Sequence, residues 1–426
     1  MNNNTFRILA QDAMQCNDTW KTGLNNNDVI IGPPGAGKTR SYIKPNLLQC
    51  QESVIVTDTK GSLLHEVGPA MAARGYRVMS IDFADLGSSD PSVCGYNPLD
   101  YIRYNEATGR WSEQDIQSVA HALVEDTPHD PFWGEAARQY LACLIAYTLE
   151  QSPPEDRNLH SVMQRFSDMY YDRCSKFDRL MRDLELEKPD SYALRIFRTI
   201  RGNTSSEKTP ASICCILSAN LDTFTFDTAM AMYTRKNRVD FAALGRERTA
   251  LFLTVSDTDR SLDRLVGLFY DQALHFLCNS ADRDYPDHRL PVPVRFMLDD
   301  FAAGTKIHDF DNLTSVIRSR EIYVSIVLQS LSQLNATYGE HRTETILNNC
   351  DNLLYLGGQD VKTAQYIAIK ANKTVNTILD MPLGDAYLFT RGKPPRQVHK
   401  FDLCSHERYH ELPEAAGNRD QPDRGI

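Results

Sequence analysis

The chain has 426 residues, of which 42% are hydrophobic and 24% are charged, and its formal net charge is −10. This is the balance of a globular protein with enough apolar material for two or three domains. The acidic total argues against a surface coated with basic residues for duplex DNA, but it is compatible with a local basic pore or groove, because net charge averages over the whole surface.

From residue 28 to about residue 83, apolar strands alternate with helical segments. The strands are "DVIIG", "SVIVTD" and "YRVMSIDF", and the helices are "GKTRSYIKPNLL" and "GSLLHEVGPAMAARG", the second closed by Gly75. Strands that alternate with helices predict a parallel sheet.

The middle of the chain has a different character. Strand-like runs give way to the helical periodicity of "DIQSVAHALVED", "WGEAARQYLACLIAYTLEQ" and "SYALRIFRTIRG". Strands return at "TALFLTVSD" and continue through "VRFMLDD", "IYVSIVLQ", "NLLYLGG" and "DAYLFTRG". We therefore predict an α/β nucleotide-binding domain in two parts, 1–104 and 241–412, interrupted by an inserted all-α domain, 105–240, and followed by a polar tail, 413–426.

Ten cysteines are present, but no two have the spacing C-x-x-C. Zinc sites and disulfide frameworks need clustered or patterned cysteines, so we interpret these residues as the reduced thiols of a cytosolic protein. No apolar run approaches the ~20 residues that span a bilayer. The N-terminus also lacks the pattern of a signal peptide. We expect a cytoplasmic chain, with any membrane association supplied by a partner or by a segment not present in this sequence.

The stretch "IIGPPGAGKTRSYIKPN" contains the complete phosphate-loop pattern G-x-x-x-x-G-K-T between a strand and a helix. Its glycines let the backbone wrap around phosphates, and the helix N-terminus adds partial positive charge. We expect Lys38 to reach the β- and γ-phosphates and Thr39 to ligate Mg²⁺. The predicted nucleotide-binding residues are Gly32, Pro33, Pro34, Gly35, Ala36, Gly37, Lys38, Thr39 and Arg40.

A phosphate loop needs a carboxylate at the end of a nearby strand to hold the metal. Candidate strands end at Asp58, at Asp257 and at the pair Asp299-Asp300. The pair follows the apolar run "VRFML", so we assign Asp299 to Mg²⁺ and Asp300 to the attacking water. The alternative is a pair of solvated loop acids after a strand.

Downstream, "SVIRSREIYVSIVLQSLSQL" contains Arg318 and Arg320 before a strand that ends at Gln329. An arginine near a subunit boundary can stabilise transition-state charge on a neighbour's γ-phosphate, and a strand-end glutamine can sense that phosphate or the attacking water. The alternative is that these are surface arginines and a helix-capping amide.

Taken together, these segments resemble the coupling ATPases of type IV secretion and conjugation (the TraG/TraD family), particularly those of Gram-positive elements. The resemblance runs from about residue 22 to about residue 401, and its more specific parts are Lys44-Pro45-Asn46, Asp58-x-Lys60-Gly61 and the run "QSLSQL". The other matching segments are "IIGPPGAGKTRSYIKPNLL", "VIVTDTKGSLL", "YNPLDYI", "DPFWGEAARQYLACLIAY", "FMLDDFA", "IRSREIYVSIVLQSLSQL" and "NNCDNLLYLGGQD".

The resemblance implies a RecA-like motor domain with an inserted all-α domain, ATP and Mg²⁺ as ligands, and hexamers with nucleotide between subunits. It implies that Asp299 sits at the metal position, that Arg318 is the arginine acting in trans and that Gln329 is the strand-end glutamine. Asp58 and Lys60 would line the site, and Arg320 is a secondary candidate. The implied partners are single-stranded DNA with bound relaxase and the secretion channel, and the inserted domain would contact the incoming cargo.

Two features depart from the family pattern. The usual Asp-Glu-Phe-Ala reads Asp299-Asp300-Phe301-Ala302 here, which sets the second carboxylate back by about one methylene and predicts weaker activation of water. The sequence before the phosphate loop, which begins at Gly32, is also too short for the family's usual N-terminal membrane anchor, so either the anchor has been trimmed or this is a form without one. We expect a form without the anchor, which another protein docks at the inner face of the membrane.

Three functions remain open at this point. The first is a hexameric, DNA-translocating ATPase, for which Arg195, Arg198 and Arg201 on one helical face are candidate phosphate contacts, although such a face is more often only solvated. The second is an ATP-gated docking receptor for protein cargo with little turnover, which the short Asp300 would suit. A monomer in isolation is compatible with either function. The third hypothesis is a generic cytosolic P-loop NTPase with no role in transfer, such as an assembly switch. The near full-length resemblance gives it least support.

Overall fold

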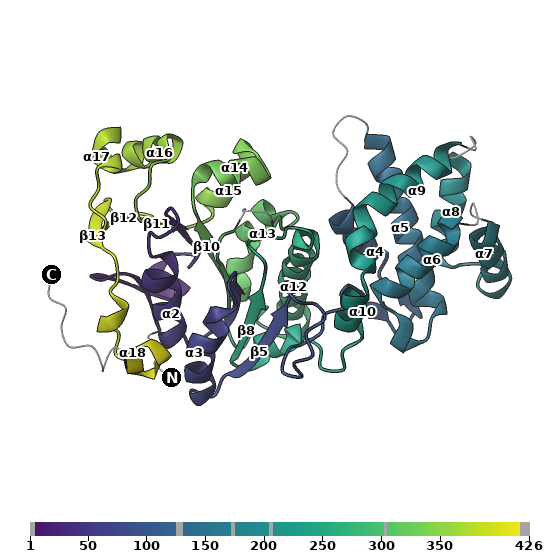
Figure 1. Cartoon of the computed structure of the whole chain (residues 1–426), viewed down its shortest axis with the longest axis horizontal. Coiled ribbons are helices and arrows are strands. Elements are labelled where there is room, and N and C mark those ends of the chain that lie inside the picture. Colours follow the sequence, from purple (N-terminus) through teal and green to yellow (C-terminus); the bar gives the residue numbers. More distant parts are fainter. Residues whose placement is uncertain (1–4, 125–130, 172–174, 204–207, 302–304, 418–426) are drawn as a thin grey trace. The chain divides into compact units, whose positions relative to one another are not determined.

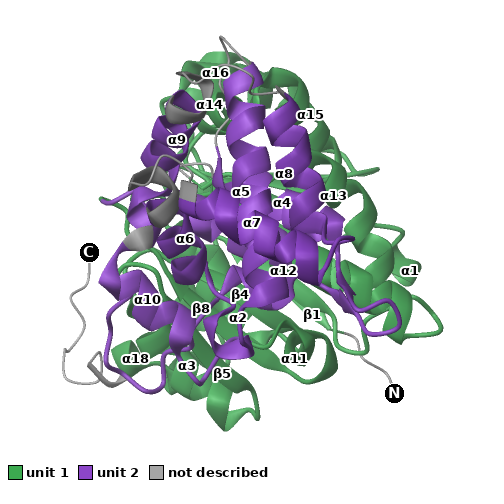
Figure 2. Ribbon diagram, turned by 90° about the vertical axis from the view of Figure 1, so that its right-hand side faces the viewer, with its two compact units in different colours: residues 1–84, 240–258, 273–426 green, residues 85–239, 259–272 purple. Residues whose placement is uncertain are grey.

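A computed structural model describes residues 5–124, 131–171, 175–203, 208–301 and 305–417 of the protein (Figure 1). The chain divides into two compact units, which Figure 2 shows in green and purple. Unit 1 comprises residues 1–84, 240–258 and 273–426, and unit 2 comprises residues 85–239 and 259–272. Within the described ranges, no helix is both long and apolar enough to cross a membrane.

Unit 1 is built on a nine-stranded sheet with the strand order β13-β12-β11-β3-β10-β9-β4-β8-β5. The strands are β3 (Asp28–Ile31), β4 (Ser53–Asp58), β5 (Arg77–Asp82), β8 (Thr249–Thr254), β9 (Val294–Leu298), β10 (Ile322–Leu328), β11 (Asn352–Tyr355), β12 (Asp385–Thr390) and β13 (Arg396–His399). All neighbours from β11 to β5 pair in parallel, whereas β12 pairs antiparallel with both β11 and β13. The predicted α/β fold with a mostly parallel sheet is confirmed.

The central strands form because their sequences are continuous apolar runs rather than alternating ones. Every residue of β3, β4, β9, β10 and β11 is buried. Such runs are typical of parallel strands that are covered on both faces. The α-helices of unit 1 among the described residues are α1 (Thr19–Thr22), α2 (Lys44–Gln49), α3 (Ser62–Ala73), α11 (Phe241–Arg246), the second part of α12 (Asp263–Asp284), α13 (Phe310–Val316), α14 (Leu331–Tyr338), α15 (Glu340–Asn348), α16 (Val361–Ala371), α17 (Val375–Leu379) and α18 (Pro413–Gly417).

Unit 2 is mainly helical. Its helices are α4 (Glu113–Leu123), α5 (Pro131–Gln151), α6 (Leu159–Tyr171), α7 (Ser175–Glu187), α8 (Tyr192–Asn203), α9 (Lys208–Leu221), α10 (Asp227–Thr234) and the first part of α12 (Asp263–Asp284). A short hairpin, β6 (Tyr104–Asn105) with β7 (Arg110–Trp111), precedes α4.

The boundaries of unit 2 differ from those of the insert predicted at 105–240. The unit begins at residue 85 and includes residues 259–272. Within it, Gly95 forms a bridge with Arg238, and the buried Tyr96 hydroxyl donates to Gln272 Oε1 at 2.6 Å. These contacts join segments that are far apart in the sequence, and residues 85–103 have no helical period that would have assigned them to a helical unit.

The N-terminus of unit 1 forms a hairpin that the sequence analysis did not predict. It pairs β1 (Phe6–Ala10) with β2 (Ala13–Cys16) in antiparallel register, with an irregularity between Ile8 and Ala10. The two strands are short, so alternation over so few residues gave no usable signal.

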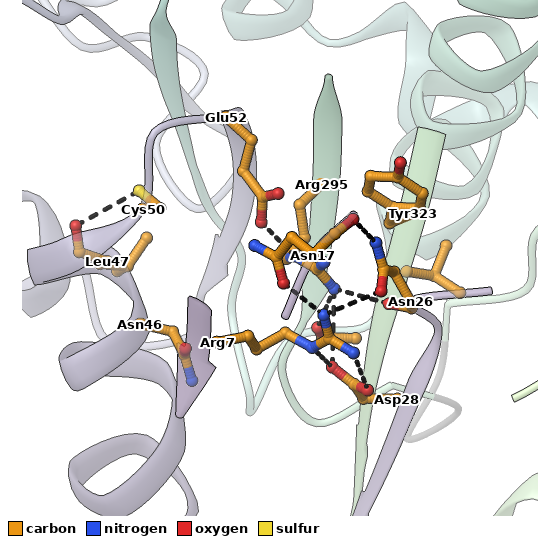
Figure 3. Close-up of polar contacts among 12 residues, drawn as sticks. Arg7, Asn17, Asn26, Asp28, Asn46, Leu47, Cys50, Glu52, Arg295 and Tyr323 are labelled. Atoms are coloured by element: carbon orange, nitrogen blue, oxygen red, sulfur yellow. Dashed lines mark hydrogen bonds and ion pairs between the residues drawn. The ribbon is translucent and has the colours of Figure 1, made fainter. Parts of the chain in front are cut away.

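A buried network of charged residues surrounds Asp28, the first residue of β3 (Figure 3). The carboxylate of Asp28 pairs with Arg7 of β1 at 2.5 Å and accepts a hydrogen bond from the Tyr42 hydroxyl at 2.6 Å. Asn352 of β11 donates to it at 2.9 Å, and Arg295 of β9 lies 3.6 Å away. One carboxylate thus contacts side chains from three strands and from the helical turn after the phosphate loop.

Arg295 is itself completely buried, with 0% of its surface exposed. It pairs with Glu52, and it donates to Ser325 Oγ at 3.1 Å and to the carbonyl of Asn26 at 3.0 Å. Two arginines and two carboxylates therefore balance one another in the interior, which is the condition under which buried charge is tolerated.

Asp28→Asn is expected to destabilise the protein by about 3–5 kcal/mol, because it leaves a buried arginine without its counter-charge. The measurement is the free energy of unfolding from urea denaturation. The control is Asp12→Asn, which removes the ion pair with Arg396, whose side chains are 53% and 50% exposed. That change should cost less than about 1 kcal/mol. Equal losses in the two variants would show that Asp28 is not the centre of the network.

Candidate phosphate-binding site

The phosphate loop follows β3 at the edge of the sheet where the parallel strands end. Gly35 and Gly37 have φ angles of +78° and +87°, which residues with a side chain rarely adopt. At Gly32, a Cβ atom would lie 2.9 Å from the Cβ of Ala36 and 3.0 Å from that of Leu356, so only glycine fits there. The loop therefore needs its glycines for two reasons, backbone conformation and close packing.

The helix after the loop begins with a π-helical turn, η1 (Thr39–Ile43), and continues as α2. Lys44 N–H donates to the carbonyl of Thr39, five residues earlier. Pro45 has no N–H with which to pair the carbonyl of Ser41, so the ordinary helical ladder is interrupted at this point. The Lys44-Pro45-Asn46 segment thus produces a wide first turn directly behind the loop.

Asn46 anchors this turn to the N-terminal hairpin. Its Oδ1 accepts from the N–H of Ile8 and its Nδ2 donates to the carbonyl of Ile8, both at 2.8 Å. The same Nδ2 donates to the carbonyl of Tyr42 at 2.8 Å, and Asn46 is buried. The side-chain amide therefore makes the two backbone hydrogen bonds with Ile8 that a neighbouring strand would otherwise make. Sequence analysis singled out the motif but not this role.

Lys38 places a buried cation inside the loop. Its Nζ donates to the carbonyls of Gly32 at 2.9 Å and Pro33 at 3.3 Å, and its residue is 8% exposed. The carboxylate of Asp300 lies 3.9 Å from the same nitrogen. A buried ammonium held mainly by carbonyl groups, at a helix N-terminus, is suited to an anion, so the residues present fit a phosphate group.

Thr39 and Asp299 meet although 259 residues separate them in the sequence. Thr39 Oγ1 donates to Asp299 Oδ2 at 3.2 Å. Burial, and then the neighbouring charge of Asp300, raises the pKa of Asp299 to about 6, against the opposing effects of Lys38 and Thr39. A divalent cation would lower that pKa again, and hydroxyl and carboxylate oxygens are ligands that Mg²⁺ prefers.

Asp300 has a left-handed backbone conformation, with a φ angle of +48°, which is uncommon outside glycine. Its N–H donates to Asp299 Oδ1 at 3.0 Å, and Gln329 Nε2 donates to its Oδ1 at 3.3 Å. Left-handed backbone outside glycine is strained and gathers at functional sites. The next residue of the motif after Phe301, Ala302, lies outside the described residues.

The structure thus brings Lys38, Thr39, Asp299, Asp300 and Gln329 together at one edge of the sheet. Their strands β3, β9 and β10 are parallel and end side by side. A phosphate chain held by the loop would meet a cation, two candidate metal ligands, a carboxylate and an amide.

The side chains of the other predicted arginines have partners outside the phosphate loop. Arg40 donates to Glu414 at 2.6 Å and to Cys404 Sγ at 3.4 Å, so it is engaged by the C-terminal segment rather than by the loop. Arg318 lies before β10, at the opposite end of this strand from Gln329, and donates to the carbonyl of Thr19 at 3.4 Å.

Arg320 and Asp58 have structural partners. Arg320 makes a two-point contact with Asp282 at 2.7 and 2.9 Å. Asp58, at the end of β4, accepts from the N–H groups of Lys60 at 3.3 Å and Leu64 at 3.1 Å, and burial raises the pKa of its carboxyl. It therefore holds the start of α3, while the Lys60 side chain is exposed.

The three arginines of α8 that were candidate DNA contacts all have acidic partners within unit 2. Arg195 pairs with Glu113, Arg198 with Glu185 and Arg201 with Asp178. Their charges are thereby compensated locally, so this helical face is not a free basic strip in the structure.

The sheet order and the loop define a P-loop nucleotide-binding protein of the RecA-like type. Solved structures support that fold: TrwB in complex with ADP and Mg²⁺ has a TM-score of 0.65 at 18% identity, covering 90% of this chain and 87% of that chain. VirB4 of Thermoanaerobacter pseudethanolicus has a TM-score of 0.55 at 14% identity, covering 94% and 97%.

The chain belongs to the type IV secretory system conjugative DNA transfer family, which its sequence matches over residues 4–377. Protein VirD4 of Rhizobium radiobacter is 24% identical over 83% of this chain and 50% of that protein. VirD4 of Agrobacterium fabrum is 23% identical over 83% and 51%. The chain spans about half the length of the curated relatives it matches.

Asn46→Ala is expected to lower the free energy of unfolding by about 2 kcal/mol, because it leaves the backbone groups of Ile8 without their buried partner. Urea denaturation measures the loss, and hydrogen exchange should become faster at Ile8. Gln49→Ala is the control: Gln49 donates to the carbonyl of Phe6 from the same helix, but at an exposed site. It should change stability by about 0.5 kcal/mol or less. A similar loss in both variants would contradict the anchoring role.

Proposed function

We propose that this chain is the motor part of a coupling ATPase, which uses ATP binding and hydrolysis to recruit relaxase-bound single-stranded DNA and translocate it to a secretion channel. The observation that carries the proposal is the cluster of Lys38, Thr39, Asp299 and Asp300 behind a complete phosphate loop. Membership of the conjugative DNA transfer family supports the DNA-transfer role. The similarity in fold to TrwB, which was solved in complex with ADP and Mg²⁺, supports the choice of ligands.

Binding would rest on the loop. The backbone N–H groups from Gly35 to Thr39 would surround the phosphates, because Pro33 and Pro34 have no N–H and that of Gly32 donates to the carbonyl of Leu328. Lys38 would leave the carbonyls of Gly32 and Pro33 for the β- and γ-phosphate oxygens. Thr39 and Asp299 would hold Mg²⁺, which neutralises phosphate charge when bound. Arg40 would contribute only if it were released from Glu414.

Hydrolysis would rest on the residues at the ends of β9 and β10. Asp300 would accept a proton from the attacking water, and Gln329 would orient that water or contact the γ-phosphate. Arg318 lies too far along β10 from the loop of its own chain, so we assign it to the nucleotide of a neighbouring subunit in a hexamer. A monomer in isolation fits this assignment, because the site would be completed on assembly.

The helical insert, predicted at 105–240, would contact the relaxase or other cargo. The chain would work in the cytoplasm at the inner face of the membrane, docked by a channel protein or a membrane-anchoring partner. This localisation rests on the family alone.

A second candidate is an ATP-gated docking receptor for protein cargo with little turnover. Two observations favour it: the second acid of the pair is the short Asp300, and the arginines of α8 are paired with acids. It requires the same nucleotide site and differs from the motor in needing no DNA-stimulated hydrolysis.

ATP turnover, measured with and without single-stranded DNA, separates the two functions. For the motor, DNA should stimulate turnover, and Lys38→Ala should abolish it, because the phosphates lose their buried cation. Asp300→Glu should hydrolyse ATP faster by about tenfold, since it extends the carboxylate toward the water. ATP binding without turnover, with or without DNA and with the Glu variant no faster, would contradict the motor and support the receptor.

A further inference from the structure

Gln333 is a conspicuous residue of the "QSLSQL" run to which the functions above assign no role. It lies four residues after Gln329, on the first turn of α14, and its Nε2 donates to Gln329 Oε1 at 3.3 Å. Gln329 Nε2 in turn donates to Asp300 Oδ1 at 3.3 Å. Asp300, Gln329 and Gln333 thus form a chain of side chains that begins 3.9 Å from Lys38.

The direction of this chain follows from the chemistry of its first member. An ionised carboxylate only accepts hydrogen bonds, so the amide of Gln329 must turn its NH₂ group to Asp300. Its carbonyl oxygen then faces Gln333, which can satisfy that oxygen only with its own NH₂ group. The reversed orientation of Gln329 would place its oxygen against the carboxylate and its NH₂ against the donor of Gln333.

The side chain of Gln333 also has an unused hydrogen-bond acceptor. Its Oε1 is buried and has no hydrogen-bond partner among the described residues. This oxygen can therefore accept a further hydrogen bond, for instance from water.

The nearby carboxylate of Asp360 does not compete with Gln329 for the NH₂ group of Gln333. Gln329 and Gln333 both line a cavity of about 250 Å³ between the phosphate-loop prolines Pro33 and Pro34 and the segment that follows β11. Asp360 is the carboxylate of this cavity, and it already accepts from Thr363 N–H at 3.0 Å and from Ser332 Oγ at 3.1 Å. It therefore has donors of its own.

We propose that Gln333 is a positioning residue, which holds the amide of Gln329 with its NH₂ group toward Asp300 and thereby toward the reacting phosphate. The inference rests on the proposed ATPase function and assigns the second glutamine of the run a part in it. Gln333 acts through Gln329 and does not itself touch the nucleotide.

Gln333→Glu tests the orientation directly. A carboxylate at this position accepts but does not donate, so it would attract the NH₂ group of Gln329 and turn its oxygen toward Asp300. We expect kcat for ATP to fall about 10- to 100-fold with KM unchanged, as for other residues that orient a catalytic group. Burial of this position should raise the pKa of the new carboxyl above its ordinary value of about 4.3, so that its protonation between pH about 8 and about 5.5 restores a donor. The ratio of the variant's kcat to that of the native chain at the same pH should therefore rise as the pH falls, and the effect of Asp299, which both chains share, cancels in that ratio.

The matched control is Gln359→Glu, which adds the same charge to the same cavity from an exposed position after β11. It should keep kcat within about twofold of the native value, because it leaves the amide chain intact. Gln333→Met, which removes both polar atoms at similar size, should lower kcat without the pH-dependent recovery.

A second readout does not depend on turnover. The affinity for ADP with aluminium fluoride, an analogue of the transferring phosphate, should fall about 10-fold in Gln333→Glu, whereas the affinity for ADP alone should be unchanged. Equal effects of Gln333→Glu and Gln359→Glu, or native behaviour of Gln333→Met, would overturn the inference. A native chain that binds neither ligand would instead overturn the proposed function, and this inference with it.

Discussion

The structure depends on a carboxylate at the base of the phosphate-loop strand. Asp28 is 1% exposed and contacts Arg7, Tyr42 and Asn352, so it joins the N-terminal hairpin, the turn after the loop and the neighbouring strand β11. Buried ion pairs gain little free energy over apolar packing, but an unmatched member costs several kcal/mol. The network therefore determines which strands pair with one another, but it adds little to the free energy of folding.

This constraint reaches the site because β3 is short. Only Val29, Ile30 and Ile31 separate Asp28 from Gly32, and all three are buried between neighbouring strands. Tyr42 returns from the far side of the loop to the same carboxylate and to Ser325 of β10. The phosphate loop is thus held at both of its ends by one buried charge cluster, and Lys38 supplies the charge within the loop itself.

The sequence predicted those parts of the fold that local patterns encode. Continuous apolar runs located β3, β4, β9 and β10, and the loop pattern with the paired acids located Lys38, Thr39 and Asp299 as candidates. It did not reveal the role of Asn46, because a buried amide that serves a distant strand has no local pattern. It also assigned candidate functional roles to Arg40, Arg195 and Asp58. In the structure, Arg40 pairs with Glu414, Arg195 pairs with Glu113, and Asp58 accepts hydrogen bonds at the start of α3. Those contacts arise from residues far apart in the sequence or from capping geometry, which composition and spacing do not encode.

The two ends of the sheet differ in how closely their opposite charges approach one another. At the base, the carboxylates of Asp28 and Glu52 face arginines at contact distance. At the carboxyl ends, Asp300 adopts a strained conformation, its carboxylate remains 3.9 Å from Lys38, and the pKa of Asp299 is raised by burial. Strained conformations and unfavourably placed charges are tolerated mainly at functional sites. There the surrounding structure must hold the strained residues in place. The buried network at the base supplies part of that support, and the loosely paired charges at the opposite edge fit a phosphate group, which brings charge of its own.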